Sequence, residues 1–124
     1  MYISYAEILN FRALKSISIP LQKFSIILGE NDVGKTSFLY ALDTFFSDKK
    51  VSDANDFFKK VISENIIIKL TFKDIPENDT LNTLKRANGE IIIQKIFAFD
   101  KPPIANAILD NDKAEELSKK VLNE

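Results

Sequence analysis

The sequence predicts an α/β fold in which short strands precede and follow one amphipathic helix. Residues 2–11 and 16–21 alternate polar and apolar side chains, as half-buried strands do. The run "FSIIL" at 24–28 is almost entirely apolar, which is typical of a strand covered on both faces. After residue 37 the apolar residues recur every three or four positions, which is the period of a helix. A buried strand is therefore expected to lead through a short loop into a helix.

The first two strands are expected to pair with each other. The four residues "RALK" at 12–15 separate them, and connections this short join antiparallel neighbours. The residues "QK" at 22–23 then lead into the apolar run at 24–28, which we expect to be a central strand. Together these strands predict a mixed sheet that includes an antiparallel β subdomain.

The helix is predicted from apolar residues that share one face, namely Phe38, Ala41, Leu42, Phe45 and Phe46. The polar residues "SDKK" at 47–50 end this pattern. The segment 51–64 is polar around Phe57 and Phe58, which predicts a loop or short helix. We interpret these two phenylalanines as a core anchor rather than as a platform for stacking a base.

The C-terminal half is expected to hold two more strands, at 65–72 and 90–99. Between them, Asn78 or Asp79 can cap a short helix over residues 80–87, and Gly89 can follow its end. Two prolines at 102–103 then break the chain, and polar residues follow. The sequence thus divides into an N-terminal lobe at 1–100 and a polar helical segment at 101–124.

Length and composition exclude several classes of chemistry. The chain has 124 residues, fewer than most complete nucleotide-driven enzymes, which suggests a fragment of a longer protein. It contains 17 Lys and Arg against 18 Asp and Glu, so its charge selects no partner. The chain has no cysteine and no histidine, which excludes disulfides, thiolate zinc sites and histidine proton shuttles. No secretory signal or long apolar stretch occurs, so we expect a cytoplasmic protein without a membrane partner.

One motif carries the functional prediction. Residues 29–36, "GENDVGKT", satisfy the pattern G-x-x-x-x-G-K-[ST], and they lie between the apolar run and the helix. Glycines at both ends let backbone N–H groups approach phosphate oxygens and permit positive φ angles. The helix, expected to start near Lys35, directs its unpaired N–H groups toward the same anion. The motif therefore predicts a phosphate-binding loop of a P-loop NTPase, with bound ATP and Mg²⁺.

Each side chain of the motif has an expected role. Lys35 places an ammonium group on the β- and γ-phosphates, and Thr36 offers its hydroxyl to Mg²⁺, which makes Thr36 the candidate metal ligand. A hydroxyl that caps the helix N-terminus is the alternative role of Thr36, compatible with the first. The predicted nucleotide-binding residues are Gly29, Asn31, Asp32, Val33, Gly34, Lys35, Thr36 and Ser37, together with Arg12. The motif does not distinguish ATP from GTP.

Asn31 and Asp32 indicate the type of ATPase. Asn at the third position of the loop resembles the RecF and structural-maintenance-of-chromosomes branch of ABC-type ATPases, although Asn31 can also be a simple turn former. Those families mostly continue with Gly, whereas the Asn-Asp pair, preceded by "ILNFRALKSISIPL", is similar to the OLD family (overcoming lysogenisation defect), which includes the Gabija nuclease. The segment "DANDFFKKVISENIIIKLTFKDI" at 53–75 also resembles the Asp-Phe loop and following strand of that family. The resemblance extends over about residues 1–85.

The resemblance implies the N-terminal ATPase lobe of a larger ATPase and Toprim nuclease. Paired ATPase heads of such a protein are expected to hold ATP between them, as a homodimer or higher oligomer, and to regulate DNA cleavage by acidic residues far downstream. In RecF-like relatives the basic residue after the first strand lies near the nucleotide, which would let Arg12 neutralise phosphate charge. Exposure on a strand turn is the equally weighted alternative for Arg12.

Hydrolysis needs residues that this sequence lacks. The nearest candidate for the Asp-Glu pair that ends an apolar strand is Asp100, but Gln94 and Lys95 interrupt the run and Lys101 follows. The sequence has neither a signature serine-glycine loop nor a switch histidine. We therefore expect the chain alone to bind nucleotide and to be inactive as an enzyme. A RecF-like repair ATPase without a nuclease, or a nucleotide-binding regulatory module that never hydrolyses, are the alternatives.

Overall fold

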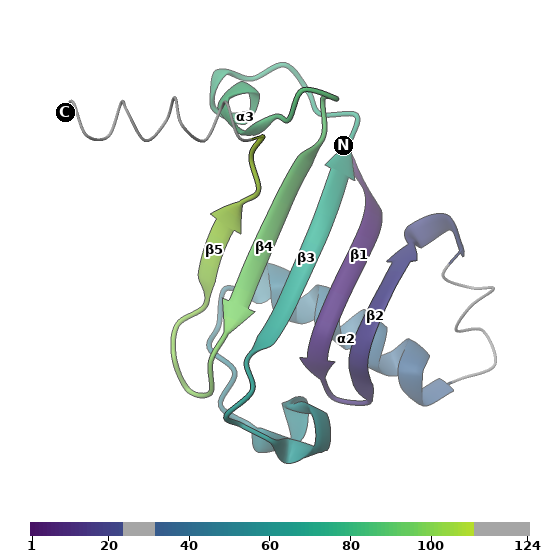
Figure 1. Ribbon diagram of the computed structural model, residues 1–124, viewed down its shortest axis with the longest axis vertical. Coiled ribbons are helices and arrows are strands. Elements are labelled where there is room, and N and C mark those ends of the chain that lie inside the picture. Colours follow the sequence, from purple (N-terminus) through teal and green to yellow (C-terminus); the bar gives the residue numbers. More distant parts are fainter. Residues whose placement is uncertain (24–31, 111–124) are drawn as a thin grey trace.

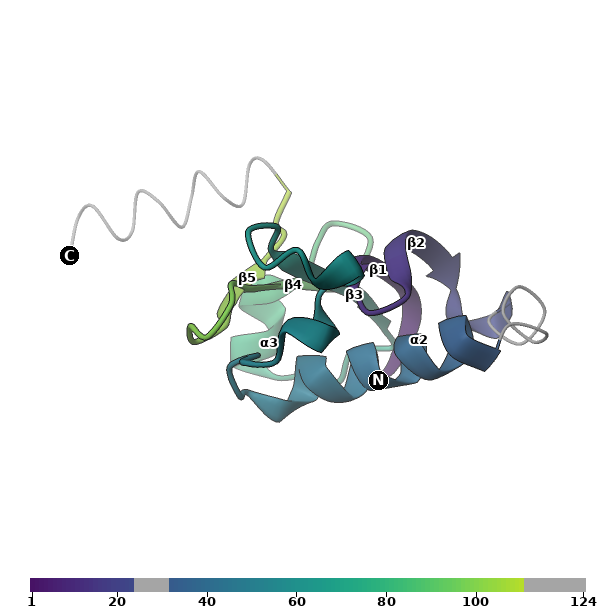
Figure 2. The same ribbon diagram turned by 90° about the horizontal axis from the view of Figure 1, so that it is seen from below.

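The computed structural model describes residues 1–23 and 32–110, which form one sheet and a helix across it. The strands are β1 (Tyr2–Phe11), β2 (Leu14–Pro20), β3 (Ile66–Lys73), β4 (Ile91–Phe97) and β5 (Ile104–Ala107). The helices are α2 (Asp32–Ser47) and α3 (Asp79–Leu84), with 3-10 turns η1 (Leu21–Lys23), η2 (Ala54–Asp56) and η3 (Phe58–Lys60). In the described residues the strand order is β2-β1-β3-β4-β5, and α2 lies across one face of the sheet (Figures 1 and 2).

Every pair of neighbouring strands in the described sheet is antiparallel. The expected pairing of the first two strands is confirmed, with Ile8 opposite Ile17. β2 begins at Leu14, two residues earlier than expected, because Arg12 and Ala13 alone make the turn. The predicted mixed sheet depends on a strand at 24–28, which lies outside the described residues.

β1 occupies an inner position because it pairs on its other edge with the distant strand β3. Ile8 lies opposite Ile68, and Ala6 lies opposite Leu70. All four side chains are fully buried, since alternate residues of each strand point to the face that α2 covers. The other face of the sheet carries the ion pair between Glu7 and Lys69, with 3.0 Å between Nζ and Oε2.

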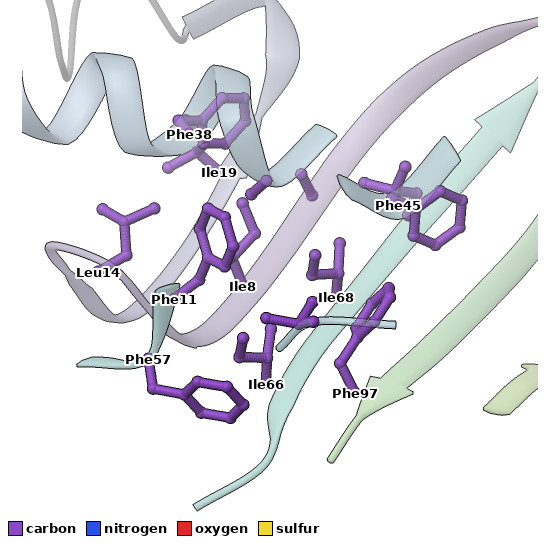
Figure 3. Close-up of a cluster of buried hydrophobic side chains, with 14 residues drawn as sticks. Ile8, Phe11, Leu14, Ile19, Phe38, Phe45, Phe57, Ile66, Ile68 and Phe97 are labelled. Carbon is purple, nitrogen blue, oxygen red and sulfur yellow. The ribbon is translucent and has the colours of Figure 1, made fainter. Parts of the chain in front are cut away.

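The hydrophobic core fills the space between the sheet and α2 (Figure 3). Phe38, Ala41 and Phe45 are buried as predicted, and Leu42 packs against the edge of the core. Phe46 differs from the prediction, because it is 56% exposed and contacts Phe45 edge to face, at 5.0 Å between ring centroids. One residue of helix rotates a side chain by about 100°. Phe46 is therefore turned away from the face that Phe45 buries.

The connection from β3 to β4 contains the predicted short helix. The side chain of Asn78 accepts a hydrogen bond from the backbone N–H of Leu81, which confirms Asn78 as the N-cap. The helix ends at Leu84 because Lys85 adopts an extended conformation. Gly89 is therefore not the residue after the helix, and its φ of 84° instead belongs to the turn that enters β4.

The prediction of a helical segment at 101–124 is wrong for its first part, which contains a strand. Ile104–Ala107 form β5, an edge strand in which Ile104 lies opposite Ile96 of β4. Two prolines precede this strand and restrict the chain to extended backbone, which favours a strand over a helix. The rest of the predicted segment, 111–124, lies outside the described residues. No helix in the described ranges is long and apolar enough to cross a membrane.

Candidate nucleotide-binding site

Helix α2 begins inside the predicted phosphate-binding motif. It starts at Asp32, three residues before the expected start at Lys35, so that Gly34 lies in its first turn and is buried. The prediction of a positive φ at Gly34 is therefore wrong. Among the glycines in the described residues, Gly89 is the one with a positive φ. Gly29 and Asn31 lie outside the described residues. The motif therefore contributes the N-terminal turn of a helix to the site.

A cavity of about 610 Å³ lies beside this helix terminus. Its walls come from three parts of the chain: the β1–β2 turn, the start of α2 and the turn η2. The lining residues are Arg12, Ala13, Val33, Thr36, Ser37, Asp53, Asn55 and Asp56. The structure thus brings Arg12, Val33, Thr36 and Ser37, all predicted from the sequence, to one cavity. A second cavity of about 330 Å³ shares Thr36 and adds Leu39, Tyr40 and Asp43 of the same helix.

The predicted residues of α2 differ in their accessibility at this cavity. Thr36 and Val33 are exposed and line the cavity, whereas Lys35 is half-buried and is not one of the lining residues. Ser37 is only 4% exposed, and its hydroxyl oxygen accepts a hydrogen bond from the backbone N–H of Ala13 at 3.3 Å. Ser37 therefore connects the helix to the β1–β2 turn, in addition to lining the cavity. Thr36 presents its side chain where a bound ion or ligand could reach it.

Arg12 is tied to Asp56 twice. Its backbone N–H donates to the carbonyl oxygen of Asp56 at 2.9 Å, and its side-chain Nε donates to Oδ1 of the same residue, also at 2.9 Å. Its guanidinium carbon lies 4.0 Å from the ring centroid of Tyr40, within the range of a cation–π contact. These contacts join β1, η2 and α2 around one positive charge. Arg12 is thus more than a solvent-facing turn residue, and it lies at the predicted site.

The turn η2 is held in place from both ends. Asp53 accepts a hydrogen bond from the backbone N–H of Asn55 at 2.9 Å and so caps the turn. Phe57, next to Asp56, is 1% exposed and pairs with Phe11 through an isolated β-bridge. The interpretation of Phe57 as a core anchor is confirmed, whereas Phe58 is half-buried and does not belong to the core cluster. From the sequence, no function was predicted for the polar residues of η2. The only signal in this segment was the Asp-Phe pair, which resembles a loop of the OLD family.

Asp100, the nearest sequence candidate for a hydrolytic carboxylate, makes contacts that stabilise the fold. Its Oδ1 accepts a hydrogen bond from the Ser52 hydroxyl at 2.7 Å and lies 3.3 Å from the ammonium of Lys50. The hydrogen bond from Ser52, followed by the contact with Lys50, lowers the pKa of the Asp100 carboxyl below its ordinary value of 3.8. Asp100 thus ties the segment after α2 to the end of β4. Within 1–23 and 32–110 no group of three or more His, Cys, Asp or Glu could hold a metal ion.

The chain belongs to the AAA ATPase domain family, whose model matches residues 1–124. It is also similar to Endonuclease GajA of Bacillus cereus (strain VD045), with 40% identity over 75 residues. This match covers 57% of the chain and 13% of the length of GajA, so the chain spans a small part of that relative. The predicted resemblance to the ATPase lobe of OLD-type nucleases, the Gabija nuclease among them, is confirmed by these two matches.

Proposed function

We propose that this chain is a nucleotide-binding lobe that holds the phosphates of ATP, with Mg²⁺, at the N-terminus of α2. The observation that carries the proposal is the cavity in which Arg12 meets Thr36 and Ser37. Arg12 and the motif belong to different elements of the fold, and the cavity brings them together. A volume of about 610 Å³ falls in the range of 300–1,000 Å³ that is usual for small-molecule sites.

The chemistry of the lining residues, together with that of the other residues of the motif, suits a polyphosphate. The start of α2 presents the N-terminal turn of a helix, where the positive end of the helix dipole favours an anion. Lys35 and Arg12 supply two cationic side chains, and Thr36 supplies a hydroxyl for the Mg²⁺ that bound phosphates bring. Gly29, Asn31 and Asp32 complete the predicted loop. Asp53, the N-cap of η2, and Asn55 within that turn are available to the rest of the nucleotide.

In a longer protein the same lobe would serve an ATP-regulated DNA nuclease. This part of the proposal rests on the similarity to Endonuclease GajA and on the family resemblance of the motif. Two such lobes would enclose ATP between them, and DNA would be cleaved by residues outside these 124. The chain by itself contributes binding rather than turnover, because hydrolysis requires a positioned water and a catalytic carboxylate beyond the phosphate cradle. A role in defence against phage or in DNA processing is the expected biological context.

Calorimetry with a non-hydrolysable ATP analogue and Mg²⁺ tests the binding proposal. Lys35→Ala should lower the affinity roughly ten- to hundredfold, because it removes hydrogen bonds between a charged donor and phosphate. Its melting temperature without ligand should match that of the wild type. Lys49→Ala, which removes an exposed lysine beyond the other end of α2, is the matched control and should bind as the wild type does. Equal affinity of wild type and Lys35→Ala would contradict the proposal.

A further inference from the structure

Arg12 has a strained backbone whose position is set by Asp56. Its φ is 49°, a left-handed value that is uncommon for a residue with a side chain and that persists where neighbouring contacts hold it. Here the two-residue turn between β1 and β2 places Arg12 in this region, and two hydrogen bonds to Asp56, one from the backbone and one from the side chain, hold it there. Asp56 is itself fixed by the capped turn η2 and by the buried Phe57 beside it. The anchor of Arg12 is therefore rigid.

Among the described residues, the contacts of Arg12 leave part of its guanidinium for a ligand. The bond to Asp56 uses Nε, so the two terminal nitrogens carry the other four N–H donors. The ring of Tyr40 packs against the guanidinium at 4.0 Å and limits its rotation. The side chain of Arg12 is 35% exposed and lines the cavity, so these donors are accessible to an anion.

We propose that Asp56 and Tyr40 are positioning residues, which orient the guanidinium of Arg12 toward the phosphates of the bound nucleotide. This inference rests on the proposed function, since it assigns the orientation of one cation in that site. Neither residue needs to touch the nucleotide. Asp56 fixes the guanidinium through Nε, Tyr40 supports its face, and the terminal nitrogens of Arg12 form the fork that recognises phosphate.

The sign of the effect at Asp56 separates positioning from simple electrostatics. A carboxylate at the edge of the cavity repels phosphate, so its removal would tighten nucleotide binding if charge alone mattered. If Asp56 acts by orienting Arg12, its removal weakens binding, because the guanidinium then loses its fixed direction. Asp56→Asn retains an oxygen that can accept from Nε, and should therefore restore most of the affinity that Asp56→Ala loses.

Affinities of the complete chain for an ATP analogue with Mg²⁺ test this inference. Asp56→Ala should weaken binding roughly three- to tenfold, and Asp56→Asn should stay within about twofold of the wild type. Tyr40→Ala should weaken binding roughly two- to fivefold, whereas Tyr40→Phe, which keeps the ring, should not. Adenosine has no phosphate, so its affinity for Asp56→Ala should equal its affinity for the wild type. Ligand-observed NMR measures both.

Glu7→Ala is the matched control for loss of a carboxylate. It breaks an ion pair of similar length and exposure on the other face of the sheet, and should leave binding unchanged. Equal or tighter binding by Asp56→Ala, while Lys35→Ala still binds poorly, would overturn the positioning role and leave the proposed function intact. A wild type that binds no nucleotide would overturn both. If Asp56→Ala does not fold, the Tyr40 pair decides the matter, because Tyr40 is 47% exposed and its loss removes little of the core.

Discussion

Lys95 of β4 donates a hydrogen bond to the carbonyl oxygen of Phe45, in the last turn of α2, at 2.5 Å. Its ammonium also lies 3.0 Å from Oδ1 of Asp48 and 4.6 Å from the ring centroid of Phe45. A cation at this end of a helix compensates its negative dipole and satisfies a carbonyl without an intrahelical partner. Lys95 therefore joins the sheet to the end of α2 opposite the predicted phosphate site.

Replacing Lys95 should reduce stability. Lys95→Met keeps the apolar stem but removes the ammonium, so the free energy of unfolding should fall by about 1–2 kcal/mol. Urea denaturation of both proteins measures the difference. Lys69→Met is the control, because Lys69 is 33% exposed and its ion pair with Glu7 should contribute less than about 1 kcal/mol. A larger loss in the control than in Lys95→Met would contradict this role.

The hydroxyl of Thr36 should decide how much Mg²⁺ strengthens nucleotide binding. Thr36→Val keeps the shape of the side chain but removes the oxygen, so the gain in affinity on adding Mg²⁺ should fall by roughly tenfold. Thr36→Ser keeps the oxygen and should retain the gain. Titrations of the ATP analogue with Mg²⁺ and with EDTA give the comparison. If Mg²⁺ strengthened nucleotide binding by Thr36→Val as much as it does in the wild type, the metal would be bound by groups other than the Thr36 hydroxyl.

At Gly89, in the turn before β4, the cost of a substitution should depend only on how readily the new residue adopts a positive φ. A Cβ atom added at Gly89 would meet no heavy atom within 4 Å, so any cost comes from its φ of 84°. Gly89→Ala should destabilise the protein by about 1 kcal/mol, and Gly89→Asn should cost less, because Asn adopts positive φ more readily. Thermal unfolding of the two variants tests the order. Equal stability of Gly89→Ala and the wild type would be inconsistent with a constrained turn.

Asp100 should make stability dependent on pH in the acidic range. Its pKa is lowered in the folded protein, chiefly by the Ser52 hydrogen bond and then by Lys50. The ionised carboxylate therefore stabilises the fold above its unfolded pKa, and this contribution disappears as the pH falls through the lower folded value. Asp100→Asn should be less stable than the wild type at pH 7, and the difference should shrink as the pH falls through the lowered pKa of the folded protein. Denaturation at neutral and at acidic pH, with NMR titration of the carboxyl, checks the sign.

The strands and main helix were predictable because their signals are local. Alternation defined β1 and β2, and a period of three to four residues defined α2. β5 was missed because "IANA" is a short strand of small residues, whose identity depends on pairing with β4. Phe46 was predicted to lie in the core because its spacing fits the apolar face of the helix. Which apolar residues are buried depends instead on the space between the helix and the sheet.

The candidate site was predictable only in part. The motif at 29–36 could be predicted from residue types and their order along the chain, and the role of Arg12 from the resemblance to RecF-like ATPases. The meeting of Arg12 with Asp56 and Tyr40 could not, because it depends on strand pairing and on the route of the segment after α2. Polar residues in such a segment resemble any surface loop until the fold places them beside a cavity.

The pairing of β1 with β3 has a consequence for the kinetics of folding. Arg12 follows β1 and Asp56 precedes β3, and these two residues are 44 positions apart in the sequence. The β1–β2 hairpin can form early from local contacts, whereas β1 and β3 meet only after the intervening chain closes into a long loop, which is slow. The cavity does not exist before that closure. A ligand of this cavity should therefore slow unfolding without accelerating the initial collapse, and it should protect the amides of β1 and β3 from hydrogen exchange.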